Sequence, residues 1–312
     1  MTSLIEQATR RLEQLRQAGV VVDGPPRAEG VDHAPHISKA SEPNAKGLSR
    51  SSDKPIASVA PTVSRRVDLD LDALVASGIV SPNAPRSQIA DQYRVIKRPL
   101  ITNAMGKGAA PVENGNLIMV TSALAGEGKS FTAINLAMSI ATELDNTVML
   151  VDADVARPSV LRMLGLPASP GLLDMLVGDV ADLSNVLLKT NIDKLTLLPS
   201  GTPHLRATEL LASDAMTHLI ANIAHRYSDR IIIFDSPPLL LTTESRVLAS
   251  HMGQIVMVVH AQKTLQTDVQ HALASIESCP VKMMVLNQAR NSSQGGYGGY
   301  GYGYGYEQQH AA

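Results

Sequence analysis

The sequence predicts an α/β fold in which helices cover both faces of a doubly wound, mostly parallel sheet. Three observations predict it. From about residue 117 onward, short apolar runs alternate with longer segments whose apolar residues recur at helical intervals. The short runs are apolar at consecutive positions, as expected for strands that are buried on both faces. Glycine-rich or acidic sequences follow several of these runs, at the end of the strand where such sheets bind ligands.

The elements can be placed in order along the chain. A short helix is expected from about Leu69 to Val75, since Gly78 and Pro82 stop it. Strands are predicted at residues 117–121, 147–151, 195–198, 231–234, 255–259 and 283–286. Helices are predicted between them at about 129–143, 207–226 and 265–277. The alternation indicates one α/β domain of about 225 residues.

Composition changes divide the chain into four parts. Residues 1–22 are predicted to contain an amphipathic helix, with Ser3 and Glu6 spaced as a capping box. We expect it to dock on a partner or on its own domain, and binding to a membrane surface is the alternative. Residues 23–66 are predicted to be a proline-rich flexible linker. The folded domain is expected over 67–291, and 292–312 form a Gly- and Tyr-rich tail with too few core residues to fold alone.

Overall composition excludes several classes of function. The 27 basic and 29 acidic residues give a net charge of −2, which offers no basic excess for binding nucleic acid. A single cysteine excludes a disulfide framework and a cysteine-rich zinc site. No apolar run approaches the roughly 18 to 20 residues needed to span a bilayer. We therefore expect a cytoplasmic protein.

A phosphate-binding loop is predicted in the sequence ALAGEGKS, which begins at Ala123. The segment follows a predicted strand and opens a predicted helix, as a P-loop does. Gly126 and Gly128 would let backbone N–H groups close around phosphates, Lys129 would reach the β- and γ-phosphate oxygens, and Ser130 would bind Mg²⁺. The alanine at the first position departs from the strict motif, and a glycine-rich turn with a surface lysine is the alternative.

Carboxylates follow two other predicted strands. The run at 147–151 leads into Asp152 and Asp154, and the run at 231–234 leads into Asp235. Asp235 suits the Walker B role of holding Mg²⁺ directly or through water. Asp152 and Asp154 would point to opposite faces if the chain is still extended, so we expect one to contact metal or substrate and the other to support the turn. Helix capping is the alternative role, considered mainly for Asp154.

Together, AGEGKS, LVDADVARP and IIIFDSPP resemble the bacterial tyrosine kinases, P-loop proteins akin to the Min and Par partitioning ATPases. The resemblance covers about residues 67 to 306. The N-terminal helix, the linker and the segment LDALVASGIVSP also resemble soluble autokinases encoded with exopolysaccharide export systems, including exosortase-associated ones. It implies ATP and Mg²⁺ as cofactors. Nucleotide contacts are implied for Ala125, Gly126, Glu127, Gly128, Lys129, Ser130, Phe131 and, at the adenine, Asn287. Metal contacts are implied for Ser130, Asp152 and Asp235, and catalytic roles for Lys129, Asp154 and Asp152, the last as base for the tyrosine hydroxyl.

Two positions refine this resemblance. The family pattern Asp-x-Asp-x-Arg is here Asp152-x-Asp154-x-x-Arg157, so the arginine is displaced by one residue. Leu124 occupies the position at which the partitioning ATPases carry a signature lysine, which favours the kinase branch.

A second family motif is matched loosely. Asp91, Arg94 and Lys97 keep the charge signs and the spacing of the Glu-x-x-Arg-x-x-Arg subunit-contact motif. The resemblance therefore implies that these residues lie at a contact between copies of the chain. An ordinary solvated helix face is the alternative.

Five of the seven tyrosines lie near the C-terminus. They are Tyr297, Tyr300, Tyr302, Tyr304 and Tyr306. Glycines separate them, so each could enter an active site as an extended and unobstructed segment. Beside a P-loop of this type we interpret them as phosphoacceptors, and a sticky low-complexity segment is the alternative.

We therefore expect an ATP- and Mg²⁺-dependent protein-tyrosine autokinase that phosphorylates its tail in trans and regulates exopolysaccharide synthesis or export. The expected partners are further copies in a ring, a separate transmembrane polysaccharide co-polymerase that activates the kinase, and a tyrosine phosphatase. The transmembrane co-polymerase would recruit the kinase to the inner face of the cell membrane. The alternatives are a Min- or Par-like ATPase switch that positions a membrane complex without phosphorylating protein, and an interaction protein with a degenerate site.

Overall fold

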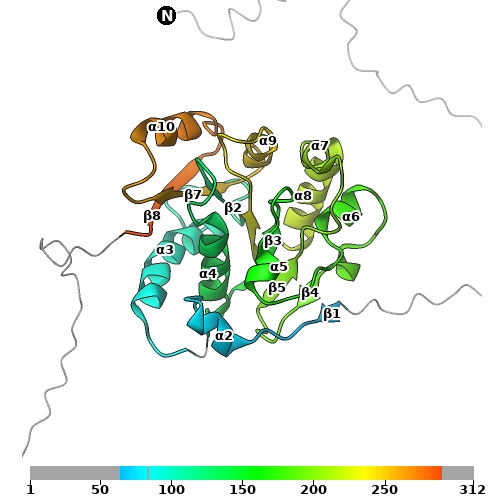
Figure 1. Ribbon diagram of the computed structural model, residues 1–312, viewed down its shortest axis with the longest axis horizontal. Helices are drawn as coiled ribbons and strands as arrows, with labels where there is room; N and C mark the ends of the chain where they lie inside the picture. The colour runs from blue at the N-terminus through cyan, green and yellow to red at the C-terminus, as the bar shows by residue number, and fades with distance from the viewer. Residues whose placement is uncertain (1–63, 83, 290–312) are drawn as a thin grey trace, which may run out of the picture. The chain divides into compact units, whose positions relative to one another are not determined.

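The computed structural model describes residues 64–82 and 84–289 (Figure 1). The predicted N-terminal helix, nearly all of the predicted linker and the five tail tyrosines lie outside these residues. Within them, no helix is both long enough and apolar enough to cross a bilayer.

An eight-stranded sheet forms the centre of the described part of the chain (Figure 1). Its strand order is β1-β4-β5-β3-β6-β2-β7-β8, and all neighbours are parallel except β4 and β5. The strands are β1 (Arg65–Arg66), β2 (Leu117–Ser122), β3 (Thr147–Asp152), β4 (Leu188–Lys189), β5 (Leu195–Leu198), β6 (Arg230–Asp235), β7 (Gln254–His260) and β8 (Val281–Asn287). All six predicted strands are present. The two additional strands have only two residues each, too few to show a periodicity, and β1 begins inside the range predicted as linker.

Helices cover both faces of the sheet, as the doubly wound prediction requires. One apolar core contains residues of α2 (Leu71–Ala76), α3 (Gln88–Ala104), α4 (Lys129–Ala141) and α5 (Val160–Met163). The other contains residues of α6 (Leu172–Leu176), η1 (Leu183–Asn185), α7 (Ala207–Leu211), α8 (Asp214–Arg226), α9 (Glu244–Ala249) and α10 (Gln266–Ala274). Helix α4 is almost wholly buried between α3 and the sheet. This burial fixes the helix that begins at the predicted P-loop.

The helix predicted over 207–226 is divided into α7 and α8. Both parts are helical, as the apolar spacing predicts. Ser213 separates them, because its side chain accepts a hydrogen bond from the backbone N–H of Met216 (3.3 Å) and starts a new helix. Serine stabilises a helix start in this way, so a second helix begins where the pattern alone predicts continuation.

Strand β8 corrects the prediction that every strand is buried on both faces. It lies at an edge of the sheet, with β7 as its neighbour. Met283 and Val285 pack against the α3 and α4 side of the core, whereas Met284 and Leu286 are 60% and 64% exposed. Apolar residues at consecutive positions therefore do not imply two-sided burial at an edge strand.

Lys97 corrects the predicted subunit contact. It is 3% exposed, its Nζ lies 2.7 Å from Glu143 Oε1, and it donates a hydrogen bond to the carbonyl of Ser139 (2.5 Å). Asp91 and Arg94 are instead accessible, with 2.6 Å between Oδ1 and Nη1. Six residues rotate a helix to a position roughly 120° away, so Lys97 faces α4 while Asp91 faces outward. The subunit-contact prediction is therefore wrong for Lys97.

We expect Lys97→Met to lower the free energy of unfolding by about 1 to 3 kcal/mol, because it leaves Glu143 and a carbonyl in the α4 region without their cation. Glu143 keeps some access to water, which limits the loss. The matched control Arg94→Met removes an exposed ion pair and should cost no more than about 1 kcal/mol. Urea denaturation measures both. Equal effects would show that the buried pair contributes no more than the exposed one.

Candidate functional site

The segment between β2 and α4 has the backbone conformation of a phosphate-binding loop. Gly126 and Gly128 have φ values of +83° and +91°, a region that favours glycine. A Cβ atom at Gly128 would also collide with the side chain of Asn287. Helix α4 begins at Lys129 without a side-chain cap, so its first N–H groups remain open. A helix start of this kind attracts phosphate oxygens.

Glu127 fastens this loop to two distant segments. It is buried, its Oε2 accepts a hydrogen bond from the Leu124 N–H (2.8 Å), and its Oε1 accepts one from the Thr264 hydroxyl. The carbonyl of Glu127 accepts a bond from Asn287 Nδ2 (2.9 Å). Asn287, predicted to contact adenine, therefore lies against the backbone of the loop. The role of Thr264 was not foreseen, since a threonine shortly before a helix looks like an ordinary helix start.

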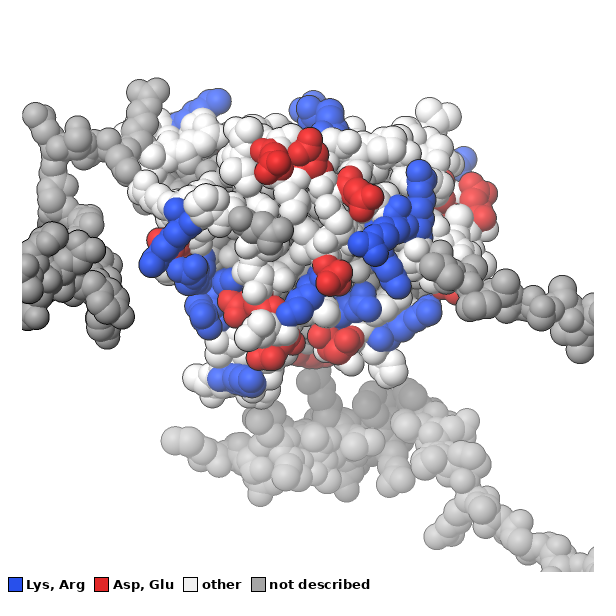
Figure 2. Space-filling model, turned by 90° about the horizontal axis from the view of Figure 1, so that it is seen from below, with Lys and Arg blue, Asp and Glu red and all other residues white. Residues whose placement is uncertain are grey.

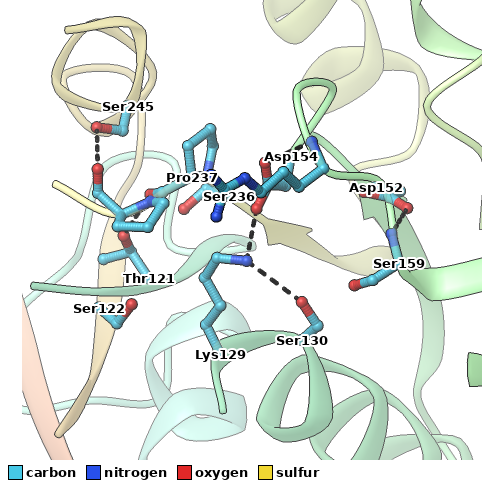
Figure 3. Close-up of polar contacts among 12 residues, drawn as sticks. Thr121, Ser122, Lys129, Ser130, Asp152, Asp154, Ser159, Ser236, Pro237 and Ser245 are labelled. Carbon is cyan, nitrogen blue, oxygen red and sulfur yellow. Dashed lines mark hydrogen bonds and ion pairs between the residues drawn. The ribbon is translucent and has the colours of Figure 1, made fainter. Parts of the chain in front are cut away.

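Lys129, Ser130 and Asp154 lie close together (Figure 3). The Lys129 Nζ lies 2.5 Å from Asp154 Oδ2 and 3.4 Å from Ser130 Oγ. Asp154 is buried, and its Oδ1 also accepts a hydrogen bond from the Arg157 N–H (3.2 Å). The lysine is therefore already aimed into the site and neutralised by a carboxylate.

Asp152 caps a helix. Its Oδ2 accepts hydrogen bonds from the N–H groups of Ser159 (3.1 Å) and Val160 (3.0 Å) at the start of α5, and the bond to Ser159 is visible in Figure 3. The capping role considered mainly for Asp154 thus belongs to Asp152. The chain turns directly after β3, and this turn carries the start of α5 back to Asp152. Its Oδ1 is buried and has no hydrogen-bond partner.

Asp235 ends β6 directly opposite Asp152, its register partner on β3. The side chain is fully buried, and neither carboxylate oxygen has a hydrogen-bond partner. Burial raises the pKa of Asp235 to about 7, although the nearby Lys129 lowers it. Burial likewise raises the pKa of Asp152 to about 6, against the N–H bonds from α5. Both carboxylates lack a full counter-charge.

This group of oxygen atoms fits Mg²⁺. The free oxygens of Asp152 and Asp235 lie beside the P-loop with Ser130, and Mg²⁺ prefers oxygen ligands while retaining several waters. Within residues 64–82 and 84–289, no three His, Cys, Asp or Glu residues are placed to enclose a metal by themselves. The residues present therefore suit a cation that is held mainly through water and nucleotide phosphate.

A cavity of about 360 Å³ opens beside the loop. Its lining includes Ala125, Gly126, Lys129, Asp154, Arg157, Pro238 and Thr242. Arg157, whose displacement left its role open, is exposed and contributes to this lining. The ring of Phe131 instead lies near Gly78, so that only the backbone of Phe131 can belong to the loop.

The segment after β6 forms the wall opposite Lys129. The N–H groups of Ser236 and Leu239 donate to the carbonyls of Val120 and Ser122 on β2. The Thr121 hydroxyl donates to the carbonyl of Pro237 (2.9 Å), as Figure 3 shows. These bonds hold the prolines after Asp235 against the P-loop strand.

Comparisons with known proteins agree with this geometry. The ParA family model for the NUBPL iron-transfer P-loop NTPase matches residues 113–293. The tyrosine-protein kinase YwqD of Bacillus subtilis (strain 168) is 30% identical over 224 residues, which cover 71% of this chain and 90% of that protein. The tyrosine-protein kinase ptk of Acinetobacter johnsonii is 31% identical over 58% of this chain, although the match spans 24% of its length. The crystal structure of the chimerical protein CapA2B2 shares the fold, with a TM-score of 0.56 and 24% identity over 71% of this chain and 93% of that chain.

The iron-transfer part of that family description has no counterpart in the site. Iron–sulfur clusters are held by cysteine thiolates. The chain has one cysteine, Cys279, and it is buried near the carbonyls of Met252 and Val281. The residues of the site support only the P-loop NTPase part of the family description.

Thr264→Val tests whether the tie to Glu127 shapes the loop. The change removes the hydroxyl donor at nearly constant volume and leaves a buried carboxylate oxygen unpartnered, at a cost of about 1 to 3 kcal/mol. We expect faster hydrogen exchange at the amides of residues 124–128 and about tenfold weaker nucleoside triphosphate binding. The control Thr208→Val removes a hydroxyl that donates to the exposed Glu209 (2.9 Å). If both variants exchange and bind like the unaltered protein, the tie does not hold the loop.

Proposed function

Because the chain belongs to the bacterial tyrosine-protein kinase family of P-loop NTPases, we propose that it transfers the γ-phosphoryl group of ATP to tyrosines of its own C-terminal tail. One observation carries the proposal: the open start of α4 and Lys129 lie beside a cavity, and the buried carboxylates of Asp152 and Asp235 near them keep oxygens without a hydrogen-bond partner. Phosphoryl transfer depends on positioning and on neutralising charge more than on covalent chemistry. This site offers both.

The geometry suggests a role for each group. The N–H groups of the loop and Lys129 would hold the phosphates, and Lys129 would exchange its contact with Asp154 for phosphate oxygens. Ser130, Asp235 and the free Oδ1 of Asp152 would hold Mg²⁺, which supplies positive charge to the β- and γ-phosphates. Asp152 is also the candidate acceptor for the proton of the tyrosine hydroxyl.

The last described residues support the tail as substrate. Asn287 at the end of β8 contacts the P-loop, so the chain continues toward its C-terminus from a point beside the proposed nucleotide site. From Ala289 to Tyr302 is 13 residues. A glycine-rich segment of this length has a root-mean-square reach of roughly 20 Å and an upper limit of about 45 Å. Such a tail could enter the site of a neighbouring copy.

The sequence resemblance to exopolysaccharide-associated autokinases is the basis for a proposed biological role. The kinase would regulate exopolysaccharide synthesis or export from the cytoplasm. A separate transmembrane co-polymerase would recruit and activate it, and a tyrosine phosphatase would reset it.

Incubation with Mg·ATP should place phosphate on one or more of the tyrosines between Tyr297 and Tyr306, as read by mass spectrometry of the C-terminal peptide. Lys129→Met should abolish the modification, because it removes the cation that would hold the β- and γ-phosphates. The matched control Lys263→Met, at an exposed lysine, should leave it unchanged. Phosphate release without phosphotyrosine would instead identify an ATPase switch.

Tail phosphorylation would also control assembly. Each phosphotyrosine adds about −1.5 to −2 charges, so five would add roughly −7.5 to −10 to a chain of net charge −2. We propose that unphosphorylated copies form a ring, phosphorylate one another and then separate. The accessible Asp91 and Arg94 on α3 remain candidates for the contact between copies.

Light scattering should therefore report a larger mass for the dephosphorylated protein than for the fully phosphorylated one, because repulsion between tails opposes assembly. A variant with the five tail tyrosines replaced by phenylalanine should keep the larger mass after incubation with Mg·ATP. Equal masses for the two phosphorylation states would refute the assembly cycle without affecting the kinase proposal.

A further inference from the structure

A second polar cavity lies at the opposite end of the sheet from the P-loop. It has a volume of about 420 Å³, and its lining includes Thr147 and Arg230, the first residues of β3 and β6. Asp152 and Asp235, the last residues of the same strands, lie at the nucleotide site. The two cavities are therefore separated by the length of the strands. In Figure 2, which views the molecule from below, basic side chains lie among acidic ones over this part of the surface.

Basic residues dominate the cavity lining. Arg66, Lys189, Lys194 and Arg230 contribute to it, and Asp193 is the one acidic residue among the described residues that do. The charged lining thus carries an excess of three positive charges, from four cations and one carboxylate. Lys194 is fixed in place, because it donates hydrogen bonds to the carbonyls of Glu143 (2.6 Å) and Leu144 (2.5 Å). We call this site the cationic cavity.

Three of the lining residues form a row along one face of the sheet. Arg66 on β1 stands directly opposite Lys189 on β4, which in turn stands opposite Thr196 on β5. Residues that are register partners point to the same face of a sheet. Two like charges directly opposite each other are destabilising unless something neutralises them. The described residues supply no acidic partner for Lys189, and the ion pair of Arg66 with Asp68 is exposed and long (4.0 Å).

Two buried polar atoms in the cavity also lack partners. They are Nε of Arg230 and Oγ1 of Thr147, which are themselves register partners. The Arg230 guanidinium lies over the ring of Tyr227, 4.8 Å from its centroid, so its orientation is already set. A buried donor without an acceptor costs about 1 to 3 kcal/mol. An oxygen-rich anion in the cavity would place hydrogen-bond acceptors beside both residues.

We propose that the cationic cavity binds the phosphate or diphosphate group of a ligand. The excess of positive charge suits an anion with two or more negative charges, and arginine with hydroxyl donors is a common way to hold phosphate oxygens. A carboxylate would neutralise a single charge and leave the pair of Arg66 and Lys189 largely unopposed. The phosphate group could belong to a soluble ligand or to a phospholipid head group, which present the same chemistry.

Binding of pyrophosphate to the full chain, with the P-loop saturated by ADP, tests the proposal. Isothermal titration calorimetry should show binding that Lys189→Gln weakens about tenfold or more, because it removes one charge-assisted contact. Lys189 is exposed and has no side-chain hydrogen bond in the described structure, so this variant should fold. Arg230→Gln should weaken binding at least as much. Lys107→Gln, at an exposed lysine away from the cavity, is the matched control for lost charge and should bind normally.

Two further readouts locate the ligand and identify its source. The Nε–H resonance of Arg230 should shift on titration, which binding elsewhere would not cause. Flotation with phosphatidylglycerol vesicles, compared with phosphatidylcholine vesicles, shows whether a lipid head group can supply the phosphate. Pyrophosphate binding alone indicates a soluble ligand, and vesicle binding that is lost in Lys189→Gln indicates a head group. If neither probe binds, or if both bind the Lys189, Arg230 and Lys107 variants alike, the proposal is wrong.

Discussion

The nucleotide site depends on two buried carboxylates that lie on neighbouring strands and are only partly compensated by positive charge. Asp152 and Asp235 are register partners at the ends of β3 and β6, and burial raises the pKa of both. Carboxylates in such a position are unfavourable unless cations or hydrogen-bond donors compensate them. Lys129, the N–H groups of α5 and the start of α4 provide part of this compensation, and a divalent cation would supply the rest. The site is therefore built around a deficit of positive charge.

Parallel strands explain why the site can be assembled from segments far apart in the sequence. The P-loop follows β2. Asp152 is the last residue of β3 and Asp154 comes shortly after it, and Asp235 is the last residue of β6. Because these strands run in the same direction, their ends meet at one edge. Glu127 then joins the loop to the segment before α10 and to the end of β8. The opposite ends of β3 and β6 meet in the same way and gather the residues of the cationic cavity.

Local spacing was enough to predict the six longer strands, the P-loop and the acidic residues that accompany it. Each of these features depends on residues that are close together in the sequence, such as AGEGKS after an apolar run. The errors concern contacts between segments. The burial of Lys97 depends on α4, the capping role of Asp152 depends on how the chain returns at α5, and the exposure of Met284 depends on β8 lying at an edge. Thr264 and the row of Arg66 and Lys189 were missed for the same reason, since they acquire meaning through partners distant in sequence.

The ion pair between Lys129 and Asp154 means that a nucleotide phosphate must compete with a carboxylate for the lysine. A nucleotide that recruits Lys129 must first separate the lysine from a buried carboxylate 2.5 Å away. The apparent affinity for the nucleotide is then the intrinsic affinity multiplied by the fraction of molecules in which Lys129 is free of Asp154. Any event that draws Asp154 aside, such as a movement of the turn that carries Arg157, would tighten nucleotide binding without touching the nucleotide. The ion pair between Lys129 and Asp154 therefore weakens nucleotide binding, and a partner that moves Asp154 could remove this effect.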